Sequence, residues 1–324
     1  MVLLAALCAY VLVGPPEPGD AAWAARRAEV REAMKDVSPP RIVLDNPGVE
    51  PRQAVTWKNQ VGDSKVYRAE FASRRVRGPL DELVDRLGGD EPAPIREECE
   101  FTAQVTAIEP DGTLVVATSI LNSTQDTAAD GVRKRAGQFA FGRRGETGIL
   151  RIPPPGKSRN EAVNEGALAG KQGLPSGLQS CMIPLESLGR GAQWHIDYTF
   201  PPLTFMELDG SWTWVLQEVT ESALQVSGSF VLRSEHSVAQ EGSPTRMHTV
   251  MVASATTRYV PGDALPEWAV MDSTLSISTS EQDSFSPQPA GLPERSFSTF
   301  SLSVLRPEKT NTAKRPNQST APSR

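Results

Sequence analysis

The sequence contains few of the residues that most often build catalytic or metal sites. Its 324 residues include only three histidines and three cysteines, and aromatic residues make up 6% of the chain. His195, His236 and His248 each lack a second ligand at the spacing of a metal-binding motif. No Gly-x-Ser-x-Gly sequence is present to seat a nucleophilic serine. These absences predict a protein without metal, cofactor or catalytic residues, and a serine hydrolase built on one of the histidines is the weakest functional alternative.

The chain also lacks an apolar run long enough to cross a bilayer as a helix. Residues 2–13 form an uncharged run of 12, whereas a spanning helix needs about 20 residues. Prolines and the small-x-small sequence at 22–24 follow, which is typical of a secretory signal and its cleavage site. No basic residue precedes the run, so a buried N-terminal segment is the alternative, and the bulky Leu7 before Cys8 argues against a lipoprotein. We expect residues 1–24 to be a signal peptide and the mature chain to be exported to the periplasm, outer envelope or exterior, with no transmembrane segment.

Basic residues are not in excess. Lysine and arginine number 33 against 39 acidic residues, for a net charge of −6, so a nucleic-acid partner is not expected. Cys99 and Cys181 are the pair that would remain after removal of the signal, and an oxidising compartment predicts a disulfide between them. Two separate buried thiols are the alternative.

Short strand patterns and turn residues are abundant. The chain has 25 glycines and 27 prolines, and polar and apolar residues alternate with period two in many segments. Strand pairs are predicted at 54–71, 99–121 and 137–152, and a series of strands follows residue 191. Short helices are predicted at 79–88 and, from a weaker pattern, within 160–170. The expected fold is mainly β, with antiparallel strands in a curved sheet, open barrel or sandwich and one or two short helices.

The predicted organisation of the chain is a single domain with flanking segments. Residues 25–52 are charged and proline-rich and read as a partly helical connector. The β-rich domain extends over 53–307, with halves at 53–152 and 188–307. Residues 308–324 are polar and lack large apolar side chains, so they are predicted to be disordered.

The stretch from Gly189 to Phe200 begins like a dinucleotide-binding loop. In such a loop the glycines lead into a helix whose N–H groups hold a pyrophosphate. Here Trp194 stands where the third glycine is expected, and apolar residues alternate after it, which predicts a strand and no cofactor. Pro184, Gly191 and Trp194 form a P–x6–G–x2–W pattern that resembles the central signature of an uncharacterised family of bacterial secreted and envelope proteins. The resemblance covers about residues 53–306 and implies a signal peptide with a β-rich domain, but no catalytic residues.

Two groups of inward-pointing side chains are candidates for ligand binding. Trp212 and Trp214 share one strand face, and Thr249, Met251 and Ala253 share a face of another. Aromatic and methionine side chains on a concave sheet could hold an apolar ligand, so a lipid or another envelope component is the expected partner of Trp212, Trp214 and Met251. The structural alternative is that they only fill the core. The leading expectation is therefore a non-catalytic envelope binding protein, with a structural or adaptor protein without a pocket as the alternative.

Overall fold

The computed structural model describes residues 39–76, 95–127, 144–158, 165–166, 182–198, 207–240, 243–281 and 294–305, together with residue 32. The predicted signal peptide, the helix predicted at 79–88 and the C-terminal tail lie outside these residues. Within the segment 160–170, Glu165–Gly166 is described and forms a short strand rather than the predicted helix.

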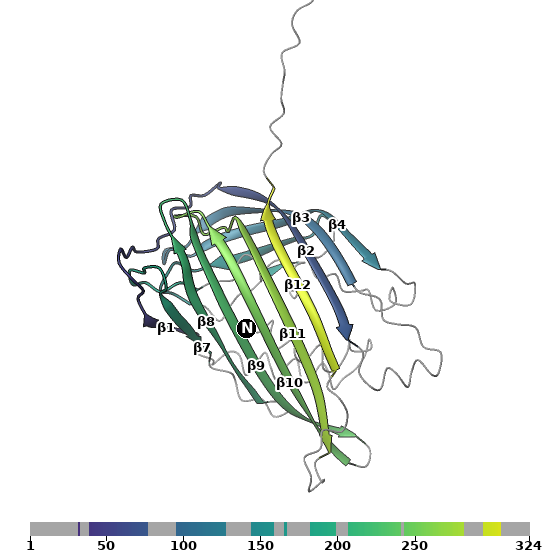
Figure 1. Cartoon of the computed structure of the whole chain (residues 1–324). Coiled ribbons are helices and arrows are strands. Elements are labelled where there is room, and N and C mark those ends of the chain that lie inside the picture. The colour runs from purple at the N-terminus through teal and green to yellow at the C-terminus, as the bar shows by residue number, and fades with distance from the viewer. Residues whose placement is uncertain are drawn as a thin grey trace, which may run out of the picture.

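Every described strand belongs to one antiparallel sheet (Figure 1). The strands are β1 (Arg41–Asn46), β2 (Ser64–Val76), β3 (Ile95–Ile108), β4 (Leu114–Thr127), β5 (Thr147–Ile152), β6 (Glu165–Gly166), β7 (Gln193–Asp197), β8 (Glu207–Val219), β9 (Leu224–Gln240), β10 (Ser243–Tyr259), β11 (Trp268–Glu281) and β12 (Glu294–Val304). Their order is β1-β7-β8-β9-β10-β11-β12-β2-β3-β4-β5-β6, so β1 and β6 are the edges and the sheet is not closed on itself. The prediction of a mainly antiparallel β fold is confirmed, in the form of a curved open sheet.

The sheet joins the two halves of the domain through one strand pair. Most neighbours in the sheet are also neighbours in sequence, as in a series of hairpins. The last strand, β12, instead pairs with β2, with Phe300 opposite Phe71 and Val304 opposite Tyr67. The described strands of the first half, β2 to β5, therefore continue directly from those of the second half.

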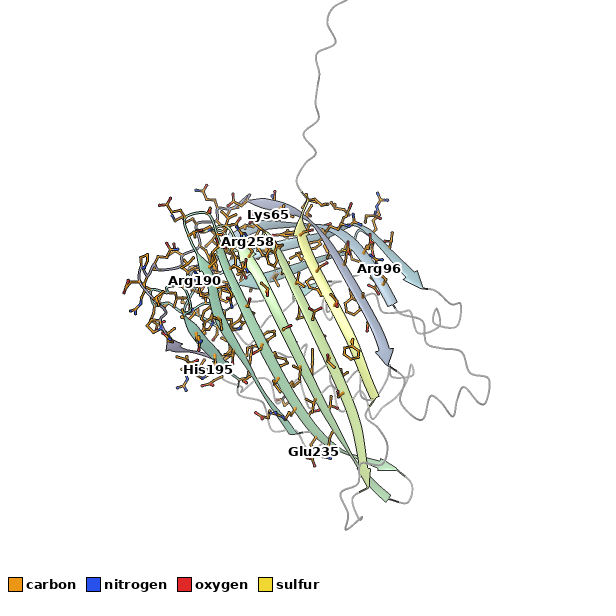
Figure 2. The ribbon with its side chains drawn as sticks, viewed as in Figure 1. Lys65, Arg96, Arg190, His195, Glu235 and Arg258 are labelled. Carbon is orange, nitrogen blue, oxygen red and sulfur yellow. The ribbon has the colours of Figure 1, made fainter. Side chains whose placement is uncertain are left out.

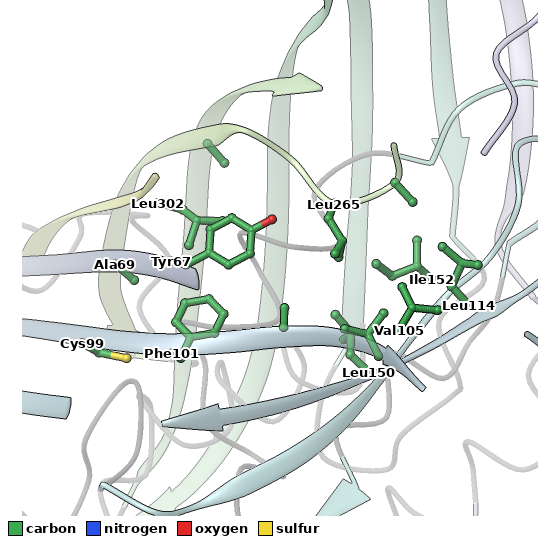
Figure 3. Packing of buried hydrophobic residues seen from close by; sticks show 14 of the residues in the cluster. Tyr67, Ala69, Cys99, Phe101, Val105, Leu114, Leu150, Ile152, Leu265 and Leu302 are labelled. Carbon is green, nitrogen blue, oxygen red and sulfur yellow. The ribbon is translucent and has the colours of Figure 1, made fainter. Parts of the chain in front are cut away.

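The two faces of the sheet differ because apolar and polar residues alternate along each strand. We call the face that carries the buried apolar side chains the inner face, and the opposite face the outer face. On β2 to β5 the inner face forms one cluster, in which Tyr67 stacks on Phe101 with ring centroids 5.2 Å apart (Figure 3). On β7 to β10 it forms a second cluster around Trp194 and Trp214.

One end of the sheet, the closed end, is covered by the chain segment between β1 and β2. This segment, residues 47–63, is called the strap. Its backbone bonds in turn to Arg190, Leu188, Gly262 and Val105, so it crosses from β7 to β3. Trp57 of the strap packs against both clusters, and its indole N–H donates to the carbonyl of Pro153 over 3.3 Å.

The strand predicted in the first part of 54–71 is not formed, because these residues belong to the strap. Residues 54–60 alternate like a strand, yet they do not pair into the sheet, whereas the predicted partner 65–71 lies within β2. Val55 and Trp57 still point to the same side, toward the core. The alternating pattern here correctly indicates that one side of the segment is buried. It does not indicate that the segment forms hydrogen bonds with a neighbouring strand.

Two other predicted elements also have clear outcomes. The hairpin at 99–121 is confirmed as β3 and β4, with Gly112 at φ +89° in the turn. Residues 25–52 were expected to be a connector, but their described part includes β1, an edge strand paired with β7. Ile42 and Leu44 of β1 pack against the second cluster, which is why this short segment joins the sheet.

Candidate functional site

The inner face of β8 and β9 carries a stack of three aromatic rings. The rings of Trp212 and Trp214 stack with centroids 4.9 Å apart, and Trp212 stacks on Phe230 at the same distance. Trp214 is only 2% exposed, whereas Trp212 is partly exposed. Trp214 is thus part of the core, and Trp212 is the ring of this stack that remains open to an incoming molecule.

The position of Trp214 follows from its cross-strand neighbour. Trp214 lies opposite Gly228 of β9, and a Cβ atom added to that glycine would be 2.5 Å from the indole ring. The missing side chain lets the ring lie flat over the backbone of β9. This fixed ring in turn supports Trp212, two residues earlier on the same face.

Met251 extends the same apolar surface onto β10. It is 8% exposed and lies opposite Leu232 of β9, next to the pair formed by Ala253 and Phe230. These four residues form a third cluster, against which Trp212 and Leu275 pack. The structure therefore brings the predicted residues Trp212 and Met251 to one surface, which we call the aromatic–methionine surface: Trp212, Phe230, Leu232, Met251, Ala253 and Leu275.

Two buried hydroxyl groups, of Ser234 and Thr249, border this surface. The sequence places Thr249 on the strand face of Met251, but it does not distinguish Ser234 from the other serines. Ser234 and Thr249 lie opposite each other on β9 and β10 and are 5% and 2% exposed. Neither hydroxyl has a hydrogen-bond partner in the described part of the chain. An unpaired buried hydroxyl costs about 1–3 kcal/mol, so these groups are positioned to gain from a ligand that accepts their hydrogen bonds.

Among the side chains that the structure describes, the inner face of β8 to β11 carries no charge near these groups. The inner-face positions of β8 to β11 with described side chains hold apolar residues, glycine, serine, threonine and tyrosine, but no acid or base. The described charged side chains of β8 to β11 lie on the outer face and near the strand ends, where Arg258 (Figure 2) pairs with Glu218 and Glu267. The aromatic–methionine surface is therefore suited to an uncharged, apolar molecule.

Cys99 lies on the inner face of β3, away from this surface. It is a free thiol, 2% exposed, and burial together with the nearby carboxylates of Glu97 and Glu100 raises its pKa to about 12. Its predicted disulfide partner, Cys181, lies outside the described residues. The structure thus shows Cys99 in its reduced form, and the disulfide remains a prediction.

The P–x6–G–x2–W residues act together to start β7. Pro184 is buried, Gly191 adopts φ +78° in the turn, and the indole of Trp194 donates to the carbonyl of Met182 over 2.8 Å. Gly191 also donates its N–H to Leu216 on β8. The predicted strand after the glycines is confirmed as β7, and these residues hold its start against the core.

His195 lies on the opposite face of β7 from Trp194. Its Nδ1 is 2.9 Å from both carboxylate oxygens of Asp45 on β1, and its Nε2 is 3.2 Å from Asp197. Both ring nitrogens thus face carboxylates, and Asp197 also pairs with Arg41. This cluster ties the edge strand β1 to β7 (Figure 2) and offers no ring nitrogen to activate a serine.

The described residues contain no group of three acidic, histidine or cysteine side chains placed to hold a metal ion. None of the helical segments in this part of the chain is long and apolar enough to cross a membrane. No protein-family model matches the chain, and comparison with curated proteins finds no similar sequence.

Proposed function

We propose that this chain is an exported, non-catalytic protein of the bacterial envelope that binds an apolar ligand on the inner face of its sheet. The ligand is a lipid or the lipid part of another envelope component. The observation that carries the proposal is the partly exposed Trp212, held between the rings of Trp214 and Phe230 at the border of an apolar cluster.

The shape of the sheet supports this proposal. Its edges β1 and β6 are not paired with each other, and both flanks turn toward the side of the inner face (Figure 1). The strap packs Trp57 against the two main clusters at the closed end. Small ligands bind preferentially on largely preformed apolar surfaces, and the clustering of Met251 with Trp212 and Phe230 supports such a site.

A structural or adaptor role is the alternative, and one observation favours it. The outer face of the sheet exposes Val252, Val270 and Phe297 on the neighbouring strands β10, β11 and β12. If the protein contacts a partner through these residues, the inner face serves only as the hydrophobic core. The two functions use opposite faces of the same strands, so variants on each face distinguish them.

The first test is native mass spectrometry of the protein expressed with its own N-terminus and recovered from the periplasm. We expect a chain processed after Ala24 that carries an adduct of lipid mass. The same spectrum gives the oxidation state of Cys99 and Cys181. A processed chain without an adduct supports the adaptor role, and an unprocessed chain in the cytosol contradicts export.

The second test replaces Trp212 with alanine and measures the binding of a long-chain alkane probe. We expect binding to weaken by about tenfold or more, since an aromatic side chain is often the main contact of an apolar site. Trp268→Ala is the matched control, because Trp268 is also partly exposed but lies on the outer face of β11. Equal binding by the two folded variants would exclude the aromatic–methionine surface as the site.

A further inference from the structure

Two serine–threonine pairs on β9 and β10 occupy the two faces of the sheet and are bonded differently. On the outer face Ser227 lies opposite Thr256, and their hydroxyl oxygens are 3.1 Å apart in a hydrogen bond. On the inner face Ser234 lies opposite Thr249, yet neither hydroxyl has a partner among the described residues. These two hydroxyls are left unpaired although they are shielded from water.

These unpaired hydroxyls lie at the end of the apolar surface. Leu232 is two residues from Ser234 along β9, and Met251 is two residues from Thr249 along β10, all on the inner face. A ligand chain packed on Leu232 and Met251 therefore brings its next atoms to both hydroxyls. Since each hydroxyl can donate one hydrogen bond, the complementary group is an oxygen acceptor attached to the apolar chain.

The described side chains on this part of the inner face are uncharged, and this distinguishes between the possible oxygen acceptors. A free carboxylate would need a cation or several strong donors to replace its water shell. The described inner-face side chains of β8 to β11 include no lysine, arginine or histidine. An ester carbonyl oxygen is uncharged and accepts two hydrogen bonds, so it fits the two hydroxyls without an uncompensated charge.

We propose that Ser234 and Thr249 together bind the carbonyl oxygen of a neutral, ester-linked acyl lipid whose chain lies on the aromatic–methionine surface. The proposal rests on the apolar-ligand function proposed above and adds the class of ligand. It predicts that the protein prefers a neutral acyl ester to the fatty acid of the same chain length.

The experiment compares 1-monooleoylglycerol with oleate, each presented to the full chain in the same nonionic detergent and measured by native mass spectrometry. We expect the ester to bind about tenfold more tightly than the acid. The double variant Ser234→Ala/Thr249→Val should weaken ester binding about tenfold and leave binding of a long-chain alkane unchanged, because only the two hydrogen bonds are lost.

The outer pair provides the matched control. The double variant Ser227→Ala/Thr256→Val makes the same chemical change on the same two strands and should bind both probes as the wild type does. The inner variant should unfold at the same urea concentration as the wild type or a higher one, because its hydroxyls are unpaired. A loss of ester binding in that variant is therefore not a loss of fold.

Equal ester binding by the wild type and the inner double variant would overturn the proposal, and so would tighter binding of oleate. If the alkane still binds and Trp212→Ala abolishes that binding, the apolar-ligand function stands while the ester assignment fails. If neither the alkane nor the ester binds the wild type, both proposals are wrong.

Discussion

At the scale of single residues, Cys99 shows how the inner face changes the chemistry of a side chain. Burial is the largest cause of its raised pKa, and the carboxylates of Glu97 and Glu100 raise it further. The thiol therefore keeps its proton at neutral pH and is a weak nucleophile. This behaviour is typical of a packing residue.

The raised pKa of Cys99 predicts a pH dependence of stability. Because an ordinary thiol titrates near 9.0 and Cys99 near 12, the unfolded chain loses this proton at a lower pH than the folded one. The stabilisation that comes from the raised pKa of Cys99 is thus complete below pH 9.0, and it is lost as the pH rises toward about 12. Cys99→Ala should show a smaller fall in the free energy of unfolding across this window, measured by urea denaturation. An identical pH dependence of the free energy of unfolding in the wild type and the variant would contradict the raised pKa of Cys99. The buried tyrosines are present in both proteins, so they affect both measurements equally.

The sequence predicts the apolar residues of the candidate site but not its polar ones. Trp212 and Met251 are recognisable because large apolar side chains at alternating positions mark a buried strand face. Ser234 and Thr249 resemble the many other serines and threonines of these strands. Their lack of partners depends on register across the sheet, which a single sequence does not determine.

At the scale of elements, the turn between β10 and β11 is fixed by one carboxylate. Asp263 accepts hydrogen bonds from Asn59 of the strap over 2.8 Å and from the N–H of Leu265 over 2.9 Å. Its other oxygen is 2.7 Å from the ammonium group of Lys65 on β2. Asp263 thereby connects a turn, the strap and a strand at the closed end, where Figure 2 labels its partner Lys65.

We predict that Asp263→Asn lowers the free energy of unfolding by about 1–3 kcal/mol, because the partly buried ammonium group of Lys65 loses its negatively charged partner and keeps only the carbonyl of Leu265. Asp272→Asn is the control, since Asp272 is exposed on β11 and accepts a single side-chain bond, from Thr299. We expect a change of less than about 0.5 kcal/mol for this variant. Urea denaturation of both proteins measures the difference, and equal destabilisation would show that the network does not hold the closed end.

The strap and β1 show where element prediction from sequence fails. Both lie in stretches rich in proline, and both place alternate apolar residues against the core. The two segments differ in whether a partner strand is present. β7 pairs with β1, whereas the strap crosses the end of the sheet. Partner strands come from distant parts of the chain, so local periodicity identifies the buried side but not the pairing.

At the scale of the whole molecule, the two main clusters belong to one continuous sheet. Trp57 and Met271 pack against both clusters, and β12 supplies the junction with β2. We therefore expect the described strands to unfold as one cooperative unit and not as two separate halves.

The variant Phe300→Ala tests this expectation at the junction. Phe300 is buried on β12 between Met271 and Phe71, so its removal should lower the free energy of unfolding by about 3–5 kcal/mol. Phe297→Ala, on the exposed outer face of the same strand, should cost less than about 1 kcal/mol. Circular dichroism and tryptophan fluorescence should give one coincident transition for each protein. Two separated transitions in the wild type would show that the halves unfold independently.

The class of fold could be predicted from the sequence, whereas the strand order could not. Regular alternation between turn residues identified most strands from β7 to β12. The insertion of β12 beside β2 brings together residues far apart in the chain, such as Phe300 and Phe71. No local pattern specifies such a pairing, since any strand with one apolar face could occupy that position.

The position of β12 also has a consequence during synthesis of the protein. β2 emerges from the ribosome early, but β12, which covers one of its edges, is the last of the described strands to be made. Until then the nascent chain carries an uncovered β2 edge beside an apolar face, which is the kind of surface that aggregates. We therefore expect the growing chain to need protection from aggregation until β12 has been made.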